Sequence, residues 1–455
     1  MTLWTAAEIA QATGGSVEGG FEAGGVAFDS REVEPGDLFV AMSGEATDGH
    51  RFLPQAFAAG AGGAIASKRC DGPHVRVQDG FAALQALGTA ARDRTAARIV
   101  GVTGSVGKTS AKEALFAALE RSNHGRVHRS VKSYNNHTGV PLSLARMPRD
   151  ADFGVFEMGM NHAGELAALT RMVRPHVAIV TAIAPAHIEF FVDEAAIADA
   201  KAEIFEGLEP GGTAIVPFDS PHRDRLIAAA RRHAGRVVTF GLEKGADVHA
   251  REVMRVGTGG TFVTATLGGG GELSFTVSQP GLHHVSNALA VLAAVDALGA
   301  DLGQAALALA ELGGLAGRGA RTTVRVGNGE ALVIDESYNA NTASMRAGLA
   351  VLAEEPGRRV AVLGEMRELG ERSAELHAGL ADAVTGARVE RALLVGEAMR
   401  PLARALEGRV DLVHVADADA ASVALRELIA PGDAVLVKGS NGVGLSRLVA
   451  GLGGA

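Results

Sequence analysis

Cysteine is almost absent from this chain of 455 residues, because Cys70 is its single cysteine. No disulfide can form within one chain, which fits a protein of a reducing compartment. Residues 1–15 also lack the basic and then apolar layout of a secretory signal peptide. We therefore expect a cytoplasmic protein.

Long hydrophobic runs and an excess of basic residues are missing as well. Apolar stretches such as Val291–Leu298 are interrupted by Asp296 and fall short of the roughly 20 residues that cross a bilayer. The formal net charge is −9, whereas a protein that binds nucleic acid usually presents a basic face. The sequence favours a soluble protein with no membrane span and no nucleic-acid partner, and it leaves room for a local phosphate pocket.

The composition that remains is ordinary for a globular protein, with 47% hydrophobic and 21% charged residues. The 60 glycines are spread along the chain without a period, which excludes collagen-like and disordered classes. At about 100–200 residues per domain, the length predicts about three domains. We place them at residues 1–95, 96–315 and 316–455.

Apolar runs alternate with helical stretches in the central domain, an order that predicts βαβ units and a mainly parallel sheet. The predicted strands are 98–103, 153–156, 177–183 and 213–216. The predicted helices are 110–121, 164–172 and 194–208, the last one capped by Asp193. Residues 246–277 alternate Val and Thr between Gly-rich turns and predict a hairpin-like extension, and two further helices follow at about 283–298 and 301–312.

The flexible, Gly-rich stretch Gly313–Gly319 marks the second domain boundary. Beyond it, strands at 331–335, 359–363, 392–395, 412–415 and 434–437 alternate with helices, which predicts a Rossmann-like doubly wound domain. Residues 1–95 contain short segments and two helices, 54–61 and 81–92, and predict a small α/β domain. The expected fold class is therefore α/β throughout.

A phosphate-binding loop is the clearest functional motif. The segment Gly101–Ser110, GVTGSVGKTS, follows a predicted strand and opens a predicted helix, so that loop N–H groups and the helix dipole converge on phosphate oxygens. Lys108 supplies a positive charge near the outer phosphates, and Thr109 supplies a hydroxyl for Mg²⁺. The common motif has glycine where this chain has Val102, but the strand–loop–helix context disfavours a mere turn with a surface lysine. The predicted ATP loop is Thr103, Gly104, Ser105, Val106, Gly107, Lys108 and Thr109.

Two further strand ends carry groups that suit a divalent metal. Glu157 and His187 each follow a predicted strand, and ligands of open α/β sheets bind at the carboxyl ends of strands. A carboxylate and an imidazole beside the phosphate loop could hold such a metal. Taken alone, Glu157 could equally be a helix cap or a surface charge, and His187 would more often be a buried, satisfied histidine.

Residue chemistry alone does not decide the role of two other segments. Lys201 lies in the predicted helix 194–208, where composition favours a solvated lysine on an amphipathic face. Asn135–Pro141 is a polar turn before a helix, and it either contacts a substrate or only makes the turn.

Together these residues resemble the Mur ligase family over almost the whole chain. The matching segments, in chain order, are Asp29–Arg31, Pro35–Ala41, Asp48–Phe52, Thr103–Thr109, Asn135–Leu142, Asp335–Asn341, Gly364–Glu371 and Lys438–Ser440. The resemblance implies a cytoplasmic three-domain ligase that uses ATP to turn a carboxylate into an acyl phosphate. It is strongest to the branch that adds D-alanyl-D-alanine to UDP-N-acetylmuramoyl-tripeptide in peptidoglycan precursor synthesis.

The resemblance also implies roles for individual residues. Contacts to the nucleotide-sugar or peptide substrates fall on Ser30, Arg31, Asn135, Asn136, Tyr338 and Asn339. Contacts to ATP beyond the loop fall on Asn287, Arg318 and Asp335. The ligands of two Mg²⁺ ions are Thr109, Glu157, His187 and Lys201, the last as a carbamate formed with CO₂. The catalytic set is then Lys108, Glu157, His187 and Lys201.

The chain departs from the family pattern at four positions. His284 replaces the usual Asn, Glu336 the usual Asp, Thr342 the usual Pro and Asn441 the usual Arg. One alternative is a sister ligase that adds a diamino acid, but its usual Asp-Asn-Pro-Arg string does not occur here. The other is a nucleotide-binding module without ligase chemistry, which the set of Glu157, His187 and Lys201 disfavours. We expect the protein to be a monomer.

Overall fold

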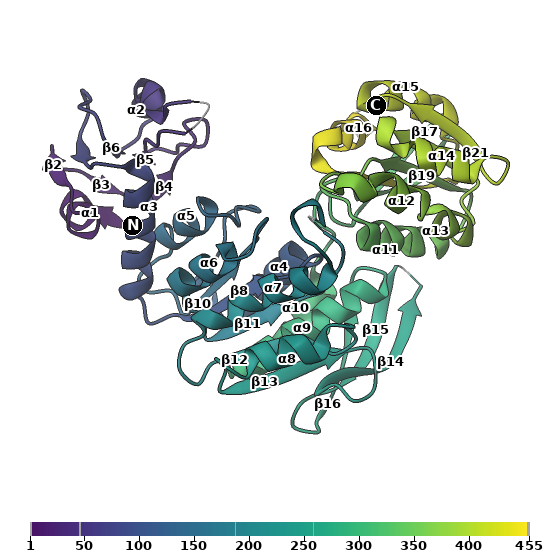
Figure 1. Ribbon diagram of the computed structural model, residues 1–455, viewed down its shortest axis with the longest axis horizontal. Helices are drawn as coiled ribbons and strands as arrows, with labels where there is room; N and C mark the ends of the chain where they lie inside the picture. Colours follow the sequence, from purple (N-terminus) through teal and green to yellow (C-terminus); the bar gives the residue numbers. More distant parts are fainter. Residues whose placement is uncertain (1, 45–46, 187, 258, 453–455) are drawn as a thin grey trace.

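The computed structural model describes residues 2–44, 47–186, 188–257 and 259–452. Three α/β units follow one another along the chain, and the N-terminal and C-terminal units stand at opposite ends of the central one (Figure 1). Their main sheets span residues 16–76, 98–277 and 320–438, which confirms the expected fold class. The boundaries at residues 95 and 315 stay a prediction.

The N-terminal unit has a five-stranded sheet in the order β2-β7-β6-β5-β4, parallel except where β2 meets β7. Its elements are β1 (Trp4–Thr5), α1 (Ala6–Thr13), β2 (Ser16–Glu18), β3 (Glu22–Ala23), β4 (Gly25–Ala27), β5 (Asp37–Val40), η1 (Gly49–Phe52), α2 (Leu53–Ala58), β6 (Gly63–Ala66), β7 (His74–Arg76) and α3 (Gly80–Asp93). Buried Trp4 donates its indole N–H to Ala145 O, and Arg92 donates to Val173 O. These bonds tie the unit to the central one.

The central unit has a nine-stranded sheet in the order β16-β15-β14-β13-β12-β11-β8-β10-β9. Its strands are β8 (Arg98–Thr103), β9 (Val127–Arg129), β10 (Phe153–Glu157), β11 (Val177–Val180), β12 (Thr213–Pro217), β13 (Arg236–Gly241), β14 (Val248–Val256), β15 (Gly260–Thr266) and β16 (Glu272–Val277). Its helices are α4 (Lys108–Asn123), α5 (Gly139–Ala145), α6 (Glu165–Val173), η2 (Ile188–Phe190), α7 (Glu194–Ala202), η3 (Glu203–Gly207), α8 (Arg223–Ala230), α9 (Leu282–Ala297) and α10 (Leu302–Glu311).

The parallel part of this sheet runs from β9 to β14, and β14, β15 and β16 continue it as an antiparallel meander. The expected hairpin-like extension is therefore confirmed. Helix α9 is apolar on nearly every face between Ala288 and Val295, because it lies inside the largest apolar cluster with strands on one side and α4 and α10 on another.

Two predicted elements of the central unit end earlier than the apolar pattern suggests. Strand β11 stops at Val180 rather than residue 183, because the Thr181 side chain turns to donate to Thr103 O and Val106 O. The helix expected over 194–208 is α-helical only to Ala202 and then tightens into the 3₁₀ helix η3. Asp193 caps it as expected, by accepting from Ala196 N–H.

The C-terminal unit has a six-stranded sheet in the order β17-β18-β22-β19-β20-β21, parallel except where β17 meets β18. Its strands are β17 (Ala320–Val326), β18 (Gly329–Glu336), β19 (Arg359–Gly364), β20 (Arg391–Val395), β21 (Asp411–Val415) and β22 (Ala434–Lys438). Its helices are α11 (Thr342–Ala353), η4 (Gly370–Arg372), α12 (Ser373–Ala378), α13 (Ala381–Gly386), η5 (Glu397–Met399), α14 (Arg400–Leu406), α15 (Ala418–Leu428), η6 (Asn441–Val443) and α16 (Leu445–Leu452). The edge strand β17 has no counterpart among the predicted strands.

The linker Gly313–Gly319 is held in place, contrary to the flexible stretch that its glycines suggested. Gly317 N–H donates to the buried Asp335 carboxylate at 2.7 Å, and Gly319 N–H donates to Asp335 O at 2.8 Å. Both glycines have positive φ, 72° and 90°, a conformation that glycine adopts without strain. The glycines therefore serve a fixed turn.

A buried carboxylate also joins the central and C-terminal units. Glu355, 3% exposed at its side chain, accepts from Arg255 of β14 at 2.8 Å and from Arg321 of β17 at 2.6 Å. Its neighbour Glu354 also contacts Arg255 but is 54% exposed.

Within the described part of the chain, no helix is both long and apolar enough to cross a membrane.

Replacing Glu355 by Gln should lower the stability of the contact between the two units. The variant keeps the shape of the side chain but leaves two guanidinium groups beside a neutral amide, which should cost about 1–3 kcal/mol. The matched control Glu354→Gln changes an exposed partner of the same arginine and should stay within about 0.5 kcal/mol. Calorimetric unfolding of both variants measures the difference, and equal midpoints would contradict the assigned role of Glu355.

Candidate functional site

A cavity of about 290 Å³ lies where the central and C-terminal units meet. Its walls come from the phosphate loop, the end of β10, the start of α9, the linker and the segment after β18. The lining residues include Ser105, Val106, Gly107, Lys108, Thr109, Asn135, Glu157, Asn287, Arg318, Glu336, Tyr338, Asn339 and Lys438. Most of the predicted ATP and metal residues thus line a single cavity.

The phosphate loop depends on glycine at two points. A Cβ on Gly104, whose φ is 149°, would lie 2.0 Å from Thr181 Oγ1, and a Cβ on Gly107, whose φ is 89°, would lie 2.6 Å from Asn287 Oδ1. The loop therefore packs directly against two side chains, and α4 begins immediately after it at Lys108. Ser105 Oγ is buried without a hydrogen-bond partner among the described residues, as expected of a group that faces a bound anion.

The buried carboxylate of Glu157 is hydrogen-bonded to two neighbouring polar side chains. It is 1% exposed, and it accepts from Thr109 Oγ1 at 2.8 Å and from Asn135 Nδ2 at 2.7 Å. A carboxylate beside a hydroxyl offers oxygen ligands that suit Mg²⁺. The expected strand-end position of Glu157, at the end of β10 next to β8, is confirmed.

Lys201 is 1% exposed, so the solvated lysine favoured by composition is wrong. Burial lowers the pKa of Lys201 well below its ordinary value, and the nearby Lys108 ammonium lowers it further. Burial also lowers the pKa of Lys108, which Glu157 raises and Arg318 lowers. The Lys108 ammonium thus interacts with Lys201 on one side and with Glu157 and Arg318 on the other, although Lys201 itself does not line the cavity.

The segment 130–138, between β9 and α5, is positioned by the buried side chain of Lys112. Lys112 Nζ donates to Lys132 O and to Ser130 O, and it pairs with Glu113 at 2.8 Å. Ser130 Oγ in turn accepts from Glu157 N–H at 2.9 Å. Lys112 thus fixes a segment that holds the Glu157 backbone and presents Asn135 to its carboxylate.

In the segment Asn135–Pro141, the two asparagine side chains have different roles. Asn136 Oδ1 accepts from Gly139 N–H at 2.9 Å and from Thr138 N–H at 3.2 Å, so this side chain makes the turn that starts α5. Asn135 instead reaches Glu157 inside the cavity. A substrate contact by either residue stays a prediction.

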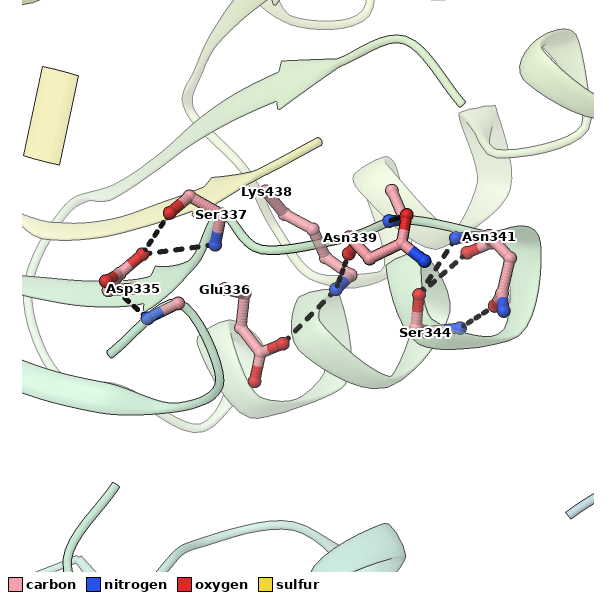
Figure 2. A network of polar contacts seen from close by, with 9 residues as sticks. Asp335, Glu336, Ser337, Asn339, Asn341, Ser344 and Lys438 are labelled. Carbon is pink, nitrogen blue, oxygen red and sulfur yellow. Dashed lines mark hydrogen bonds and ion pairs between the residues drawn. The ribbon is translucent and has the colours of Figure 1, made fainter. Parts of the chain in front are cut away.

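The C-terminal wall of the cavity is an ordered polar network (Figure 2). Asp335 accepts from Ser337 Oγ at 2.6 Å and from Gly317 N–H, so its carboxylate holds the linker and the turn after β18. Lys438 Nζ lies 3.2 Å from Glu336 Oε2 and 3.0 Å from Asn339 O. Asp335 itself does not line the cavity, and its direct contact with ATP stays a prediction.

Arg318 reaches across the cavity from the linker. Its guanidinium lies 4.0 Å from the centre of the Tyr338 ring and 3.5 Å from Ser133 Oγ on the segment 130–138. Tyr338 and Asn339 are both exposed at the cavity. A cation and an aromatic ring therefore face the phosphate loop from the other unit.

Some predicted site residues lie elsewhere. Ser30 and Arg31 belong to the N-terminal unit, where Ser30 Oγ donates to Gln55 Oε1 and Arg31 pairs with Asp29. Hydrogen bonding by Arg31 lowers the pKa of Asp29 to about 2. Neither Ser30 nor Arg31 lines the cavity. His187 lies outside the described residues.

The sequence did not predict a role for Lys112, Ser130 and Thr181. Their side chains position the segments around the cavity through hydrogen bonds. Each one acts through backbone groups of distant segments, and no local pattern of residue types records such contacts. A lysine four residues after Lys108 on a helix looks like an ordinary polar position until its burial is known.

Replacing Lys112 by Met should loosen the segment 130–138. Methionine fills similar space but leaves the carbonyls of buried Ser130 and of Lys132 without this donor, and a buried unsatisfied group costs about 1–3 kcal/mol. Amide hydrogen exchange across residues 130–138 should become faster, while the control Lys244→Met, at an exposed position between β13 and β14, should leave it unchanged. Unaltered exchange in the Lys112 variant would show that other contacts hold the segment.

Comparison with known proteins covers all three units. Profiles described as the Mur ligase family catalytic domain, the Mur ligase middle domain and the Mur ligase glutamate ligase domain match residues 22–100, 102–295 and 320–441.

Curated relatives named UDP-N-acetylmuramoyl-tripeptide–D-alanyl-D-alanine ligase match nearly end to end. The relative from Escherichia coli is 36% identical, with 93% of this chain and 92% of the relative covered. The relative from Bacillus subtilis is 32% identical, with 93% and 92% covered.

Solved structures of ligases are similar to this chain over nearly its whole length. A crystal structure of MurF from Acinetobacter baumannii is 31% identical, with a TM-score of 0.86 over 99% of this chain and 98% of that one. The MurF ligase from Thermotoga maritima in complex with ADP is 26% identical, with a TM-score of 0.77 over 94% and 96%.

Proposed function

The chain belongs to the Mur ligase family, and we propose that its cavity is where ATP drives the joining of D-alanyl-D-alanine to UDP-N-acetylmuramoyl-tripeptide. The reaction is an amide ligation in peptidoglycan precursor synthesis. A carboxylate is a poor acyl donor, because its leaving group would be oxide. Phosphorylation by ATP gives an acyl phosphate, from which the amine of the dipeptide displaces phosphate.

One observation carries this proposal: two separate sheets supply groups to the same cavity. The phosphate loop and Glu157 face it from the central unit, and Arg318 and Tyr338 face it from the linker and the C-terminal unit. A nucleotide switch needs only the groups from the central unit. A ligase also needs a second wall that holds the amine substrate and keeps water from the acyl phosphate.

Lys108 and the loop N–H groups would bind the outer phosphates of ATP. Lys108 Nζ lies 2.7 Å from Gly104 O, within the loop itself. Phosphoryl transfer needs positioning and charge neutralisation more than covalent help from the protein. Asn287, which packs against Gly107, would orient the nucleotide from α9.

Thr109 and Glu157 would hold Mg²⁺, because their oxygens are hard donors that already lie within hydrogen-bond distance of each other. When bound, Mg²⁺ neutralises charge that develops on the transferred phosphoryl group. We propose His187 as a further ligand.

Lys201 would complete the metal site as a carbamate. Its lowered pKa makes the neutral amine available, and the nitrogen lone pair can attack the carbon of CO₂ while the nitrogen releases a proton to solvent. The product carries one negative charge in place of the lysine cation. A buried anion beside Lys108 and Mg²⁺ suits a site for two metal ions better than a second buried cation does.

The length of the substrate explains why its proposed contacts are spread over three units. Ser30 and Arg31 would receive the UDP end, and Asn135 would lie near the peptide carboxyl end. Glu32 accepts from Lys132 Nζ at 2.6 Å and from Tyr134 O–H at 2.9 Å, so the segment 130–138 connects the two places. Tyr338 and Asn339 would contact the incoming dipeptide from the opposite wall.

We propose a cytoplasmic location, because both ATP and the UDP-linked substrate are made there. We also propose that the monomer is sufficient, since each proposed site residue belongs to one chain.

The experiment that tests this function is ATP-dependent phosphate release with UDP-N-acetylmuramoyl-tripeptide. D-alanyl-D-alanine should support turnover, whereas D-glutamate and diaminopimelate should not. Turnover with diaminopimelate on the dipeptide precursor would instead identify the sister ligase. Phosphate release that ignores every amine would identify a nucleotide hydrolase.

Replacing Lys108 by Ala should lower kcat by about 10³-fold or more without unfolding the protein, because the variant removes the cation that faces the transferred phosphate. The control Lys244→Ala removes an exposed lysine and should keep full activity. Calorimetry and the phosphate-release assay should be run on the same samples. Near-normal turnover of the Lys108 variant would refute its assigned role.

Replacing Lys201 by Ala should lower kcat by about 100-fold or more, because the variant cannot form the carbamate. Buffer enriched in CO₂ should not restore activity, whereas a short carboxylic acid such as acetate should restore part of it. In the unmodified chain, ¹³C-labelled CO₂ should give a carbamate signal in nuclear magnetic resonance that the variant lacks. Full activity of the variant without additive would remove the carbamate from the mechanism.

A further inference from the structure

Two histidines and a glutamate from different units converge beside the linker. His283 and His284 lie in the first turn of α9, and Glu336 ends β18. Among the described residues, one nitrogen from each imidazole and one carboxylate oxygen lie within 4.8 Å of one another. Two of the three residues, His284 and Glu336, stand where the chain departs from the family pattern.

The space that these groups face is defined by Gly319 of the linker. A Cβ at Gly319 would lie 3.1 Å from Gln279 Oε1, 3.5 Å from Glu336 Oε1 and 3.6 Å from His284 Nε2. Gln279 is 8% exposed, and its Nε2 donates to Gly313 O, but its Oε1 has no hydrogen-bond partner in the described part of the chain. A buried, unpaired oxygen therefore points to the same place as an imidazole nitrogen and a carboxylate oxygen.

This place is also a small cavity of about 10 Å³, lined among others by Gln279, His284, Gly319 and Glu336. Its volume is close to that of one ion or one water molecule. Its lining includes the unpaired acceptor Gln279 Oε1, and a buried acceptor without a donor is costly unless a cation or a water satisfies it.

We propose that His283, His284 and Glu336 form a binding site for a divalent transition-metal ion of the Zn²⁺ class, with Gln279 Oε1 next to it. Two imidazoles and one carboxylate are the ligand set of open zinc sites. Mg²⁺ favours oxygen ligands such as those of Thr109 and Glu157, whereas a pair of imidazoles favours Zn²⁺, so this site is chemically distinct from the one at Glu157.

Partial burial disfavours the protonated form of both imidazoles. It lowers the pKa of His283, which Glu336 raises and Lys438 lowers, and it lowers the pKa of His284 well below the ordinary value, with a further contribution from His283. Neutral imidazole is the form that binds a metal ion.

Two nearby cations limit the affinity. Lys438 holds Glu336 Oε2 at 3.2 Å, which leaves Oε1 for the ion and orients the carboxylate as an outer hydrogen bond does in metal sites. Arg321 also lines the small cavity, where Glu355 accepts from its Nη2 at 2.6 Å, but its buried Nη1 has no hydrogen-bond partner among the described residues. The expected site is therefore weaker than one with the same ligands and no flanking cations.

Occupancy would fasten the central unit to the C-terminal unit, because α9 belongs to one and β18 to the other. His283, His284 and Glu336 also line the larger cavity, so a bound ion would slow turnover. This regulatory consequence rests on the proposed function, whereas the binding itself does not.

Isothermal titration calorimetry of the full, tag-free chain with ZnCl₂ tests the site, and the visible absorption of Co²⁺ reports its geometry. One ion should bind per chain, and His284→Asn and Glu336→Gln should each weaken binding by at least about 10-fold. The control His233→Asn removes an exposed histidine of the same chain and should bind as the parent does.

Equal Zn²⁺ affinity of the parent and of both cluster variants would overturn the proposal, as would Mg²⁺ binding that both cluster variants weaken as much as they weaken Zn²⁺ binding. Two separate variants guard against a folding defect in one of them, and circular dichroism checks each. Calorimetry uses neither ATP nor peptide, so a failure of the ligase assay leaves the binding result standing. Zn²⁺ inhibition of phosphate release that His284→Asn relieves would add the regulatory consequence.

Discussion

The buried carboxylate of Glu157 is the constraint on which the site depends. Its two oxygens are bonded to Thr109 of the phosphate loop and to Asn135 of the segment 130–138, and its backbone is bonded to Ser130. A charge that is 1% exposed is tolerated only if its hydrogen bonds are complete. The loop, the segment and β10 must therefore keep one arrangement, which is also the arrangement that offers oxygen ligands to a cation.

In the C-terminal unit a second carboxylate, Asp335, fixes neighbouring segments as Glu157 does in the central unit. It fixes the linker through Gly317 and the turn after β18 through Ser337, and so it places Arg318 and Tyr338 opposite the phosphate loop. The two halves of the cavity are thus each organised by an acidic side chain at a strand end. What differs is that Glu157 lies inside the cavity, whereas Asp335 acts from behind its wall.

Much of this arrangement could be predicted from the sequence, because parallel strands buried on both faces appear as continuous apolar runs. Glu157 could be placed by the rule that ligands gather at strand ends. Strand β17 could not, since only Val324 of its seven residues is buried and its pattern is that of a polar segment. The burial of Lys201 and Lys112 could not either, because it results from packing between elements distant in the sequence.

The contacts of the segment 130–138 link the two places where we propose that the substrates bind. The segment touches Glu32 of the N-terminal unit through Lys132 and Glu157 of the central unit through Asn135. A ligand that moves it at one end changes the free energy of binding at the other, and linkage requires the change to be equal in both directions. The sugar nucleotide and the metal-bound nucleotide should thus alter each other's dissociation constants by one common factor, which titrations of the binary and ternary complexes would measure.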